Sequence, residues 1–224
     1  MKKQHNLDRR EFLKRLSTGT ALSAVALTGC RSQASSSLPS NTPGEVPTDK
    51  MTYRTHPTCG DQVSLLGYGC MRWPMMPAPD GKGDIIDQEA VNRLVDYALA
   101  HGVNYFDTAP PYGRGQSETA TGIALSRHPR ESYLLATKMS NQSFAREGLT
   151  GKELYKASVQ MYENSRKYLK TDYFDYYLLH SIDEESWVDV EKLDLVSFMV
   201  KLKEEGLAKH IGFSAHCEPE LLEE

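Results

Sequence analysis

DIIDQEAVNRLVDYALAHGVNYFDTAPPYG, residues 84–113, contains a helical pattern followed directly by a short strand-like run. In its first part, apolar residues recur at intervals of three and four, at Val91, Leu94, Val95, Ala98 and Leu99. That spacing puts all of them on one face of an α-helix, which can pack against a core. The stretch therefore predicts an amphipathic helix.

Residues that favour helix ends flank this pattern, and a strand follows it. Asp84 or Asp87 can accept hydrogen bonds from the free N–H groups of the first turn, and Gly102 can take the positive φ that ends a helix. The apolar run at residues 103–107 then ends in Asp107, shortly before a proline pair. Strands commonly end in turn residues, so this aspartate can be read as part of a turn.

The same alternation continues along the chain. Short apolar runs typical of strands lie at residues 64–69, 103–107, 133–138, 174–180 and 211–214. Helical patterns lie between them, over residues 84–102, 117–125, 151–170 and 194–206. Strands that alternate with helices in this way form parallel βαβ units, so the sequence predicts an α/β fold.

Two parallel architectures fit this alternation, a doubly wound sheet and a (β/α)8 TIM barrel. A dinucleotide-binding doubly wound sheet should carry G-x-G-x-x-G after its first strand. Residues 67–72 read GYGCMR, which lacks the third glycine, so we expect the barrel. Two strand-like pieces within residues 53–64 predict a hairpin that could close the bottom of this barrel.

The charge of the chain is unevenly distributed. The 224 residues are 39% hydrophobic and 25% charged, which is typical of a globular protein, and the net charge is −4. Residues 1–30 carry six basic and two acidic side chains, a net +4, so the rest of the chain carries −8. Nucleic-acid binding usually leaves a basic patch, so an acidic body gives no reason to expect that partner.

The N-terminal residues have the layout of an export signal. Arg9-Arg10 precedes an apolar run over residues 16–29, which is shorter than the roughly 20 residues that a membrane-spanning helix needs. The run closes with LTGC, ending at Cys30. Residues 1–30 thus resemble a twin-arginine signal peptide with a lipobox. We expect export to the cell envelope or periplasm and a lipid anchor on Cys30, the alternative being an amphipathic helix with a chance arginine pair.

A linker separates this signal from the body. Residues 31–52 are rich in serine and proline and nearly free of large apolar side chains, so they cannot bury enough surface to offset the entropy of ordering. We therefore expect a flexible tether, with the partial barrel occupying residues 53–224. The membrane is expected as a partner only through the lipid anchor.

Three cysteines remain once Cys30 is assigned to the lipobox. Cys59, Cys70 and Cys217 are widely spaced, and no C-x-x-C occurs, so the spacing signals neither zinc nor an iron–sulfur cluster. The sequence predicts no metal site. A disulfide between two of the three is possible in an exported protein, but we expect structural thiols.

Polar residues lie at the ends of four predicted strands. Asp107 ends the second strand, with Tyr112 in the loop that follows; Lys138, His180 and Ser214 end the third, fourth and fifth. Each alone has a structural explanation as a turn, solvated or capping residue. In a parallel barrel these ends meet at one rim, where the active site is built. The joint pattern therefore predicts a site.

These groups can together carry out proton transfer. A tyrosine phenol has a pKa of about 10, too high to exchange protons readily near neutrality. A lysine ammonium beside it lowers that pKa, and an aspartate keeps the lysine charged. A neutral histidine can hydrogen-bond to a carbonyl oxygen and orient it. Such a set can protonate an oxygen on which negative charge develops during hydride delivery.

The ordered motifs YFDTAPPYG, SE at Ser117-Glu118, ATK, LLH and IGFS resemble those of the aldo/keto reductases. The match covers essentially all of residues 51–217. The resemblance implies a TIM barrel that uses NADP or NAD to interconvert a small-molecule carbonyl and an alcohol.

The resemblance also implies roles for individual residues. Tyr112 would be the proton donor, Lys138 and Asp107 would tune its pKa, and His180 would orient the carbonyl. Ser214 would contact the nicotinamide carboxamide, and Met71 would also lie against the cofactor. The loop over residues 70–84 would overhang the substrate, where Arg72 is a candidate contact and where Trp73 is expected to pack.

The sequence departs from the family pattern in two places. The family commonly has Asn after the serine that matches Ser214, but Ala215 and His216 follow it here, which leaves one carboxamide hydrogen bond without a donor. GYGCMRWP and GFSAH are similar to a bacterial branch whose members often continue into a ferredoxin-like iron–sulfur tail. No such cysteine cluster occurs in this sequence, so that tail is not predicted here.

The length of the chain limits what the resemblance implies. A (β/α)8 barrel typically takes about 250 residues, and this sequence reaches its final residue shortly after the fifth predicted strand. We expect a barrel truncated after about five βα units, without the loops that hold the phosphates and adenine. Two other hypotheses therefore remain: a non-catalytic, envelope-anchored binding or assembly protein, and an inert, poorly folded chain.

Overall fold

The computed structural model describes residues 49–223. The signal peptide predicted over residues 1–30, including the lipidated Cys30, lies outside the described residues, as does the predicted linker except for residues 49–52. Among residues 49–223, no helix combines the length and the apolar character that crossing a membrane requires.

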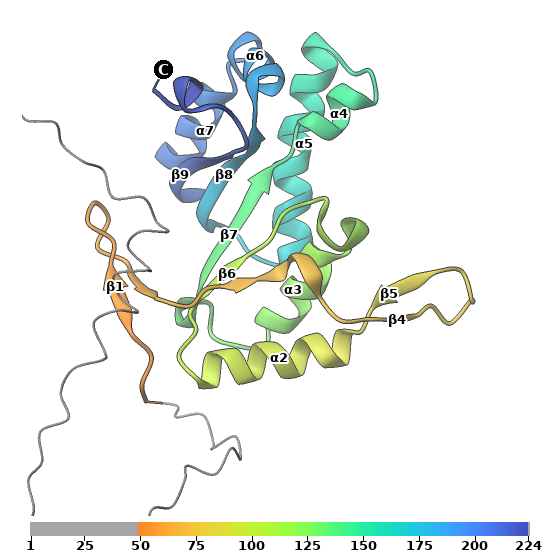
Figure 1. Cartoon of the computed structure of the whole chain (residues 1–224), viewed down its shortest axis with the longest axis vertical. Coiled ribbons are helices and arrows are strands. Elements are labelled where there is room, and N and C mark those ends of the chain that lie inside the picture. Colours follow the sequence, from red (N-terminus) through yellow and green to blue (C-terminus); the bar gives the residue numbers. More distant parts are fainter. Residues whose placement is uncertain (1–48, 224) are drawn as a thin grey trace, which may run out of the picture. The chain divides into compact units, whose positions relative to one another are not determined.

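Five parallel strands form the central sheet, in the order β3-β6-β7-β8-β9 (Figure 1). Every neighbouring pair is parallel. The strands are β3 Tyr68–Gly69, β6 Tyr105–Asp107, β7 Leu134–Met139, β8 Phe174–Ile182 and β9 Ala208–Ala215. Within residues 49–223 no pairing joins β3 to β9, so the sheet is open. The predicted parallel α/β fold is confirmed, in the form of part of a barrel.

A helix or helical pair follows each of these strands, apart from the last. They are α2 Gln88–Ala100, α3 Ser117–Leu125, α4 Gln142–Arg146, α5 Gly151–Leu169, α6 Glu184–Lys192 and α7 Leu195–Glu204. In α2, Asp87 is the N-cap and accepts from the backbone N–H of Ala90, and Gly102 has a φ of 85°. Val91, Val95 and Ala98 are buried, as the apolar spacing predicts.

The predicted N-terminal hairpin is confirmed. Strands β1 Tyr53–Thr55 and β2 Gln62–Ser64 pair antiparallel. The hairpin contacts the sheet where its parallel strands begin: the Asn104 side chain, just before β6, accepts from the backbone N–H of Ser64 at 2.9 Å and donates to the Gln62 carbonyl at 2.7 Å. It therefore covers the bottom of the partial barrel.

Two predicted elements need correction. The strand predicted over residues 64–69 is interrupted, because residues 65–67 turn and only Tyr68–Gly69 joins the sheet. The turn is held by a hydrogen bond from the Ser64 hydroxyl to the Leu66 carbonyl at 2.7 Å. The helix predicted over residues 84–102 begins at Gln88, because Asp84–Ile86 forms β5, which pairs antiparallel with β4 Met75–Pro77.

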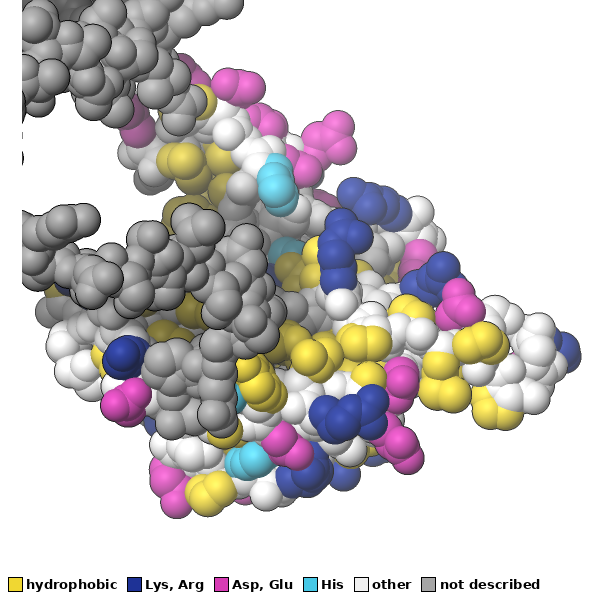
Figure 2. All heavy atoms as spheres, turned by 60° about the horizontal axis from the view of Figure 1, so that its bottom comes forward, with side chains coloured by type: hydrophobic (Ala, Val, Ile, Leu, Met, Phe, Trp, Pro, Cys, Tyr) yellow, Lys and Arg dark blue, Asp and Glu magenta, His cyan; other side chains and the backbone are white. Residues whose placement is uncertain are grey.

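The β4–β5 hairpin lies within the loop that was predicted to overhang the substrate. It projects from the rest of the molecule (Figure 1), and hydrophobic side chains gather on its surface (Figure 2). Met75 and Met76 on this hairpin are each 41% exposed. Trp73, just before it, is buried and donates from its indole N–H to the Thr121 hydroxyl at 3.0 Å. Trp73 therefore packs, as predicted.

Polar residues of α3 attach this helix to the sheet. The Ser117 hydroxyl donates to the Cys70 carbonyl at 2.7 Å, and the Thr137 hydroxyl of β7 donates to the buried Glu118 carboxylate at 2.6 Å. Burial raises the pKa of Glu118, although the hydrogen bond from Thr137 opposes that shift. The SE motif therefore helps to pack α3 against the sheet.

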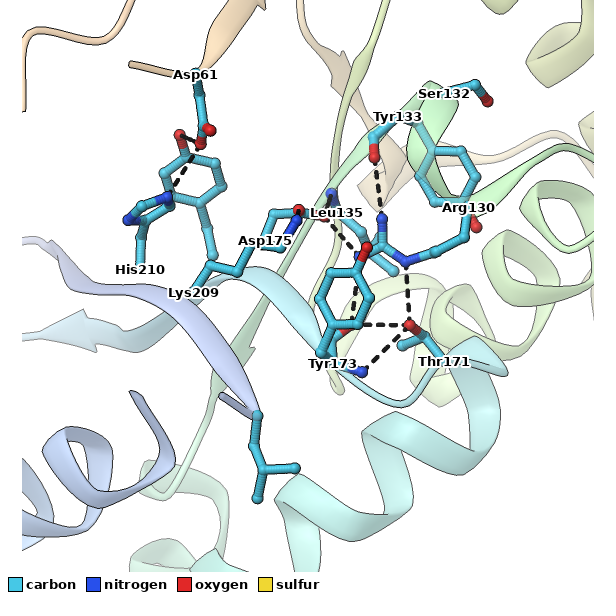
Figure 3. Close-up of polar contacts among 12 residues, drawn as sticks. Asp61, Arg130, Ser132, Tyr133, Leu135, Thr171, Tyr173, Asp175, Lys209 and His210 are labelled. Carbon is cyan, nitrogen blue, oxygen red and sulfur yellow. Dashed lines mark hydrogen bonds and ion pairs between the residues drawn. The ribbon is translucent and has the colours of Figure 1, made fainter. Parts of the chain in front are cut away.

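A buried carboxylate holds the lower ends of β7, β8 and β9 together (Figure 3). Asp175, which is 1% exposed, accepts from Arg130 Nη2 at 2.6 Å, from Lys209 Nζ at 2.9 Å and from the backbone N–H of Leu135 at 2.9 Å. Its charge is thus compensated by two cations and a backbone donor, as a buried carboxylate requires.

The three cysteines within the described residues are free thiols. Cys70 is completely buried, and burial raises its pKa to about 12, so it is a structural thiol as predicted. Cys59 and Cys217 are also free thiols and are partly buried.

Candidate active site

The predicted site residues lie together where the strands end. Asp107 is the last residue of β6, Lys138 is next to last in β7, and His180 and Ser214 lie near the ends of β8 and β9. Parallel pairing of β6, β7, β8 and β9 brings these ends to the same edge of the sheet. The arrangement agrees with the usual position of a site in a barrel of this kind.

Lys138 is the centre of the cluster. Its side chain is 5% exposed, and its ammonium donates to Asp107 Oδ1 at 2.5 Å and to the Thr108 carbonyl at 2.8 Å. A buried ammonium needs such partners to remain charged, and the carboxylate and carbonyl supply them. The pairing therefore offsets the cost of burying the ammonium below the rim.

Tyr112 lies above this ammonium. Lys138 Nζ is 4.8 Å from the centre of the Tyr112 ring, and the Tyr112 and His180 rings meet edge to face with their centres 5.6 Å apart. Tyr112 starts a short 3-10 turn, η2 Tyr112–Gly115, directly after Pro111, and Gly113 takes a φ of 57°. The proline restricts the backbone before Tyr112 and the glycine permits the sharp turn after it, so the ring has a defined position.

His180 carries a neutral imidazole near neutral pH. Burial, the positive charge of Lys138 and the charge of His216 lower its pKa to about 4. Its Nδ1 shares a hydrogen bond with the hydroxyl of Ser140, which is itself buried. When the Ser140 hydroxyl donates to Nδ1, Nε2 carries the ring proton and can donate a hydrogen bond toward a ligand at the rim.

The two residues predicted to contact the cofactor, Ser214 and Met71, lie in different surroundings. The Ser214 hydroxyl oxygen accepts from the backbone N–H of Ser181 at 2.9 Å, so the serine is fixed at the rim. Met71 lies on η1 Cys70–Arg72 and is 50% exposed. The polar and ring contacts recorded among residues 49–223 connect Asp107, Tyr112, Lys138 and His180, but they do not extend to Met71 or Ser214.

Three groups of this site are not predicted by the sequence pattern. They are the Thr108 carbonyl on Lys138, the Ser140 hydroxyl on His180, and His216, whose charge lowers the pKa of His180. Strand alternation could have identified Ser140, because it follows Lys138 by two residues and such residues point to the same face. The other two depend on how different strands meet, which periodicity does not give.

A small polar pocket lies beside the site, between the residues that follow β7 and β8. Its lining consists of Asn141, Gln142, Ala145, Arg146, Asp183, Glu185, Ser186 and Asp189. The Asn141 amide is buried, and neither its oxygen nor its nitrogen has a hydrogen-bond partner among the described residues. This pocket is therefore a second place near the rim where a polar group could be bound.

Comparison with known proteins identifies one family. The aldo/keto reductase family profile matches residues 66–224. A probable aldo-keto reductase from Glycine max is 33% identical over 159 residues, which are 70% of this chain and 43% of that protein. The aldo-keto reductase YhdN of Bacillus subtilis is 34% identical over 170 residues, 73% of this chain and 47% of that one.

Solved structures lead to the same family. The holo form of an aldo-keto reductase from Bacillus halodurans superposes with a TM-score of 0.58 at 28% identity, over 78% of this chain and 53% of that one. An aldo-keto reductase from Klebsiella pneumoniae in complex with NADPH gives a TM-score of 0.50 at 28% identity, over 69% and 46% of the two chains.

The chain thus spans less than half the length of the two curated relatives described above. The residues matched by the family profile include the parallel strands and the rim on which Asp107, Tyr112, Lys138 and His180 meet. The chain belongs to the aldo/keto reductase family.

Proposed function

We propose that this chain is the part of an NAD(P)H-dependent oxidoreductase that carries the proton-transfer residues, acting on a small carbonyl or alcohol. The observation that carries the proposal is the meeting of Tyr112, Lys138 and His180 at one rim, with Asp107 on the lysine. Family membership and the NADPH complex of the Klebsiella pneumoniae relative support the choice of cofactor.

In this proposal Tyr112 is the acid in carbonyl reduction. The Lys138 ammonium close to its ring stabilises the phenolate that remains after the proton has moved to the substrate oxygen. Asp107 keeps the ammonium charged and in place. In the reverse direction the phenolate accepts the proton of an alcohol.

His180 holds the substrate oxygen in position. Because its pKa lies at about 4, it is neutral under ordinary conditions and does not compete with Tyr112 as an acid. Its Nε2–H can donate a hydrogen bond to the carbonyl oxygen, which accumulates negative charge as reduction proceeds. The Tyr112 and His180 rings meet edge to face with their centres 5.6 Å apart, which supports a shared contact with one substrate oxygen.

The residues at the rim fit the nicotinamide end of the cofactor, which supplies or accepts the hydride when bound. Ser214 uses its hydroxyl oxygen as an acceptor for Ser181, and its hydroxyl proton has no recorded acceptor among the described residues, so it can donate to a carboxamide. Ala215 lacks a polar side chain. The exposed Met71 can pack against a ring.

The test is hydride transfer from NADPH or NADH to an aldehyde, measured on the protein as its gene encodes it. Tyr112→Phe should lower kcat by about 10²–10⁴-fold, because it removes the proton donor and keeps the ring. Tyr97→Phe, on the exposed side of α2, is the matched control and should leave turnover unchanged.

Unchanged turnover in Tyr112→Phe would refute the role of Tyr112. If the intact protein binds neither dinucleotide, a non-catalytic role in the cell envelope becomes the better explanation. Cofactor binding is followed by the change in nicotinamide fluorescence, which does not require turnover.

We further propose that the protein is exported and anchored through a lipid on Cys30. The arginine pair, the apolar run and the LTGC sequence, in that order, support this proposal. Cys30→Ala should move the protein from the membrane fraction to the soluble fraction after cell lysis, and Arg9→Lys with Arg10→Lys should block export. Membrane association that survives Cys30→Ala would contradict the anchor.

A further inference from the structure

Three side chains that are common metal ligands meet at the end of the sheet opposite the active site. Cys59 and Asp61 come from the loop of the β1–β2 hairpin, and His210 is the third residue of β9. The rim residues of β9, by contrast, lie near its last residue. The cluster is therefore separate from the tetrad of Tyr112, Lys138, Asp107 and His180.

The spacing within the cluster suits metal coordination. The Asp61 Oδ2 and His210 Nε2 atoms are 3.1 Å apart, and one ligand atom from each of the three residues lies within 4.8 Å of the other two. Around a tetrahedral zinc ion, with bonds of about 2.0–2.3 Å, ligand atoms are separated by about 3.3–3.6 Å. Small side-chain movements would therefore bring all three atoms into a coordination sphere.

The surroundings of the cluster orient the carboxylate. The Tyr176 hydroxyl donates to Asp61 Oδ2 at 2.8 Å, and Figure 3 shows the Asp61 carboxylate facing the His210 ring. Ligating carboxylates in metal sites are commonly held by such an outer hydrogen bond.

Access and the donor set both suit zinc. Cys59, Asp61 and His210 are all partly exposed, so an ion can enter from solvent. A thiolate, an imidazole and a carboxylate form a mixed sulfur, nitrogen and oxygen set, which zinc accepts and which calcium and magnesium do not prefer. Three protein ligands leave the fourth position of a tetrahedral zinc ion open to water.

We propose that Cys59, Asp61 and His210 form a zinc-binding site that attaches the N-terminal hairpin to β9. Binding releases the thiol proton of Cys59 to solvent as the thiolate coordinates the ion. Sequence spacing does not reveal this site, because His210 comes from a strand far along the chain from the two hairpin ligands. The competing explanation is that Asp61 and His210 form only an ion pair.

Zn²⁺ alone and Co²⁺ alone are the probes, used with the full chain in a Cys30→Ser background. Calorimetry should give one Zn²⁺ bound per chain, and Co²⁺ should produce a thiolate-to-metal absorption band. The melting temperature should rise with Zn²⁺ concentration, because the ion binds the folded state. Cys59→Ser and Asp61→Asn should each weaken Zn²⁺ binding at least about tenfold.

Two matched variants complete the design. Cys217→Ser removes another partly exposed thiol, and His101→Gln removes a partly exposed histidine at the C-cap of α2. Both variants should bind Zn²⁺ as the parent does. Circular dichroism without metal establishes that each variant is folded. Absence of Zn²⁺ binding by the folded parent, or binding that survives Cys59→Ser unchanged, would overturn the proposal and leave the ion pair.

Discussion

At the scale of single residues, His180 depends on its neighbours for its protonation state. Burial, Lys138 and His216 lower its pKa from the ordinary 6.5 to about 4. Between these two values the unfolded chain binds a proton that the folded chain does not, so stability should fall as the pH drops from 6.5 to 4. Above pH 6.5 His180 is unprotonated in both the folded and the unfolded chain, so it no longer makes stability depend on pH.

NMR titration of the His180 ring should give a pKa of about 4 and a single neutral tautomer at pH 7. Ser140→Ala removes the hydroxyl that binds Nδ1, so we expect a mixture of tautomers, visible in the ring ¹⁵N shifts. Ser126→Ala, at the exposed end of α3, is the control and should change neither. An ordinary pKa near 6.5 would contradict this description of the site.

Some single residues of the site can be predicted from the sequence, and others cannot. Asp107, Lys138 and His180 could be found because each ends a parallel strand, and parallel strands end on one side. Strand alternation could add Ser140 as a rim residue, but its hydrogen bond to His180 and the proposed zinc ligand His210 could not be found in this way, because those partners lie on other strands or in the hairpin. Distances between strands are not encoded in periodicity.

At the scale of elements, a glycine sets the distance between α3 and α5. A Cβ added at Gly122 would lie 2.2 Å from the Tyr168 carbonyl oxygen and 2.6 Å from the Leu169 Cα, and backbone atoms cannot move aside easily. Gly122→Ala should therefore lower the free energy of unfolding by about 1–3 kcal/mol, despite the better helix propensity of alanine.

Chemical denaturation monitored by circular dichroism measures this difference. Thr119→Ala, on the exposed side of the same helix, tests propensity alone and should leave stability equal or slightly higher. If Gly122→Ala were as stable as the parent, the helices would not be in the close contact described above.

Elements with strong local signals are predicted well, and those set by tertiary contacts are not. Asp87 and Gly102 mark the ends of α2 as their local chemistry requires. The apolar run Leu65-Leu66 predicts a strand, yet these side chains are 66% and 63% exposed, because Ser64 is held by Asn104 and the chain turns there. The sequence likewise predicts a loop where the β4–β5 hairpin forms.

At the scale of the whole molecule, the open sheet exposes an apolar edge. Within the described residues β9 pairs with β8 alone, and Phe213 on β9 is 60% exposed. Beside it lies a groove of about 300 Å³, lined mainly by apolar residues of β8, α6, α7, β9 and the C-terminal turn. Unpaired strand edges and contiguous apolar surface both favour association.

We therefore expect the 224-residue chain by itself to bind the dye ANS and to associate as its concentration rises. Phe213→Lys places a charge on the edge strand, which disfavours pairing with another chain, so it should reduce both effects. Val188→Lys, on an exposed position of α6, adds the same charge away from the edge and should reduce neither. Sedimentation velocity measures association directly. A parent chain that stays monomeric and does not bind ANS would mean that the β9 edge and its groove are covered in solution.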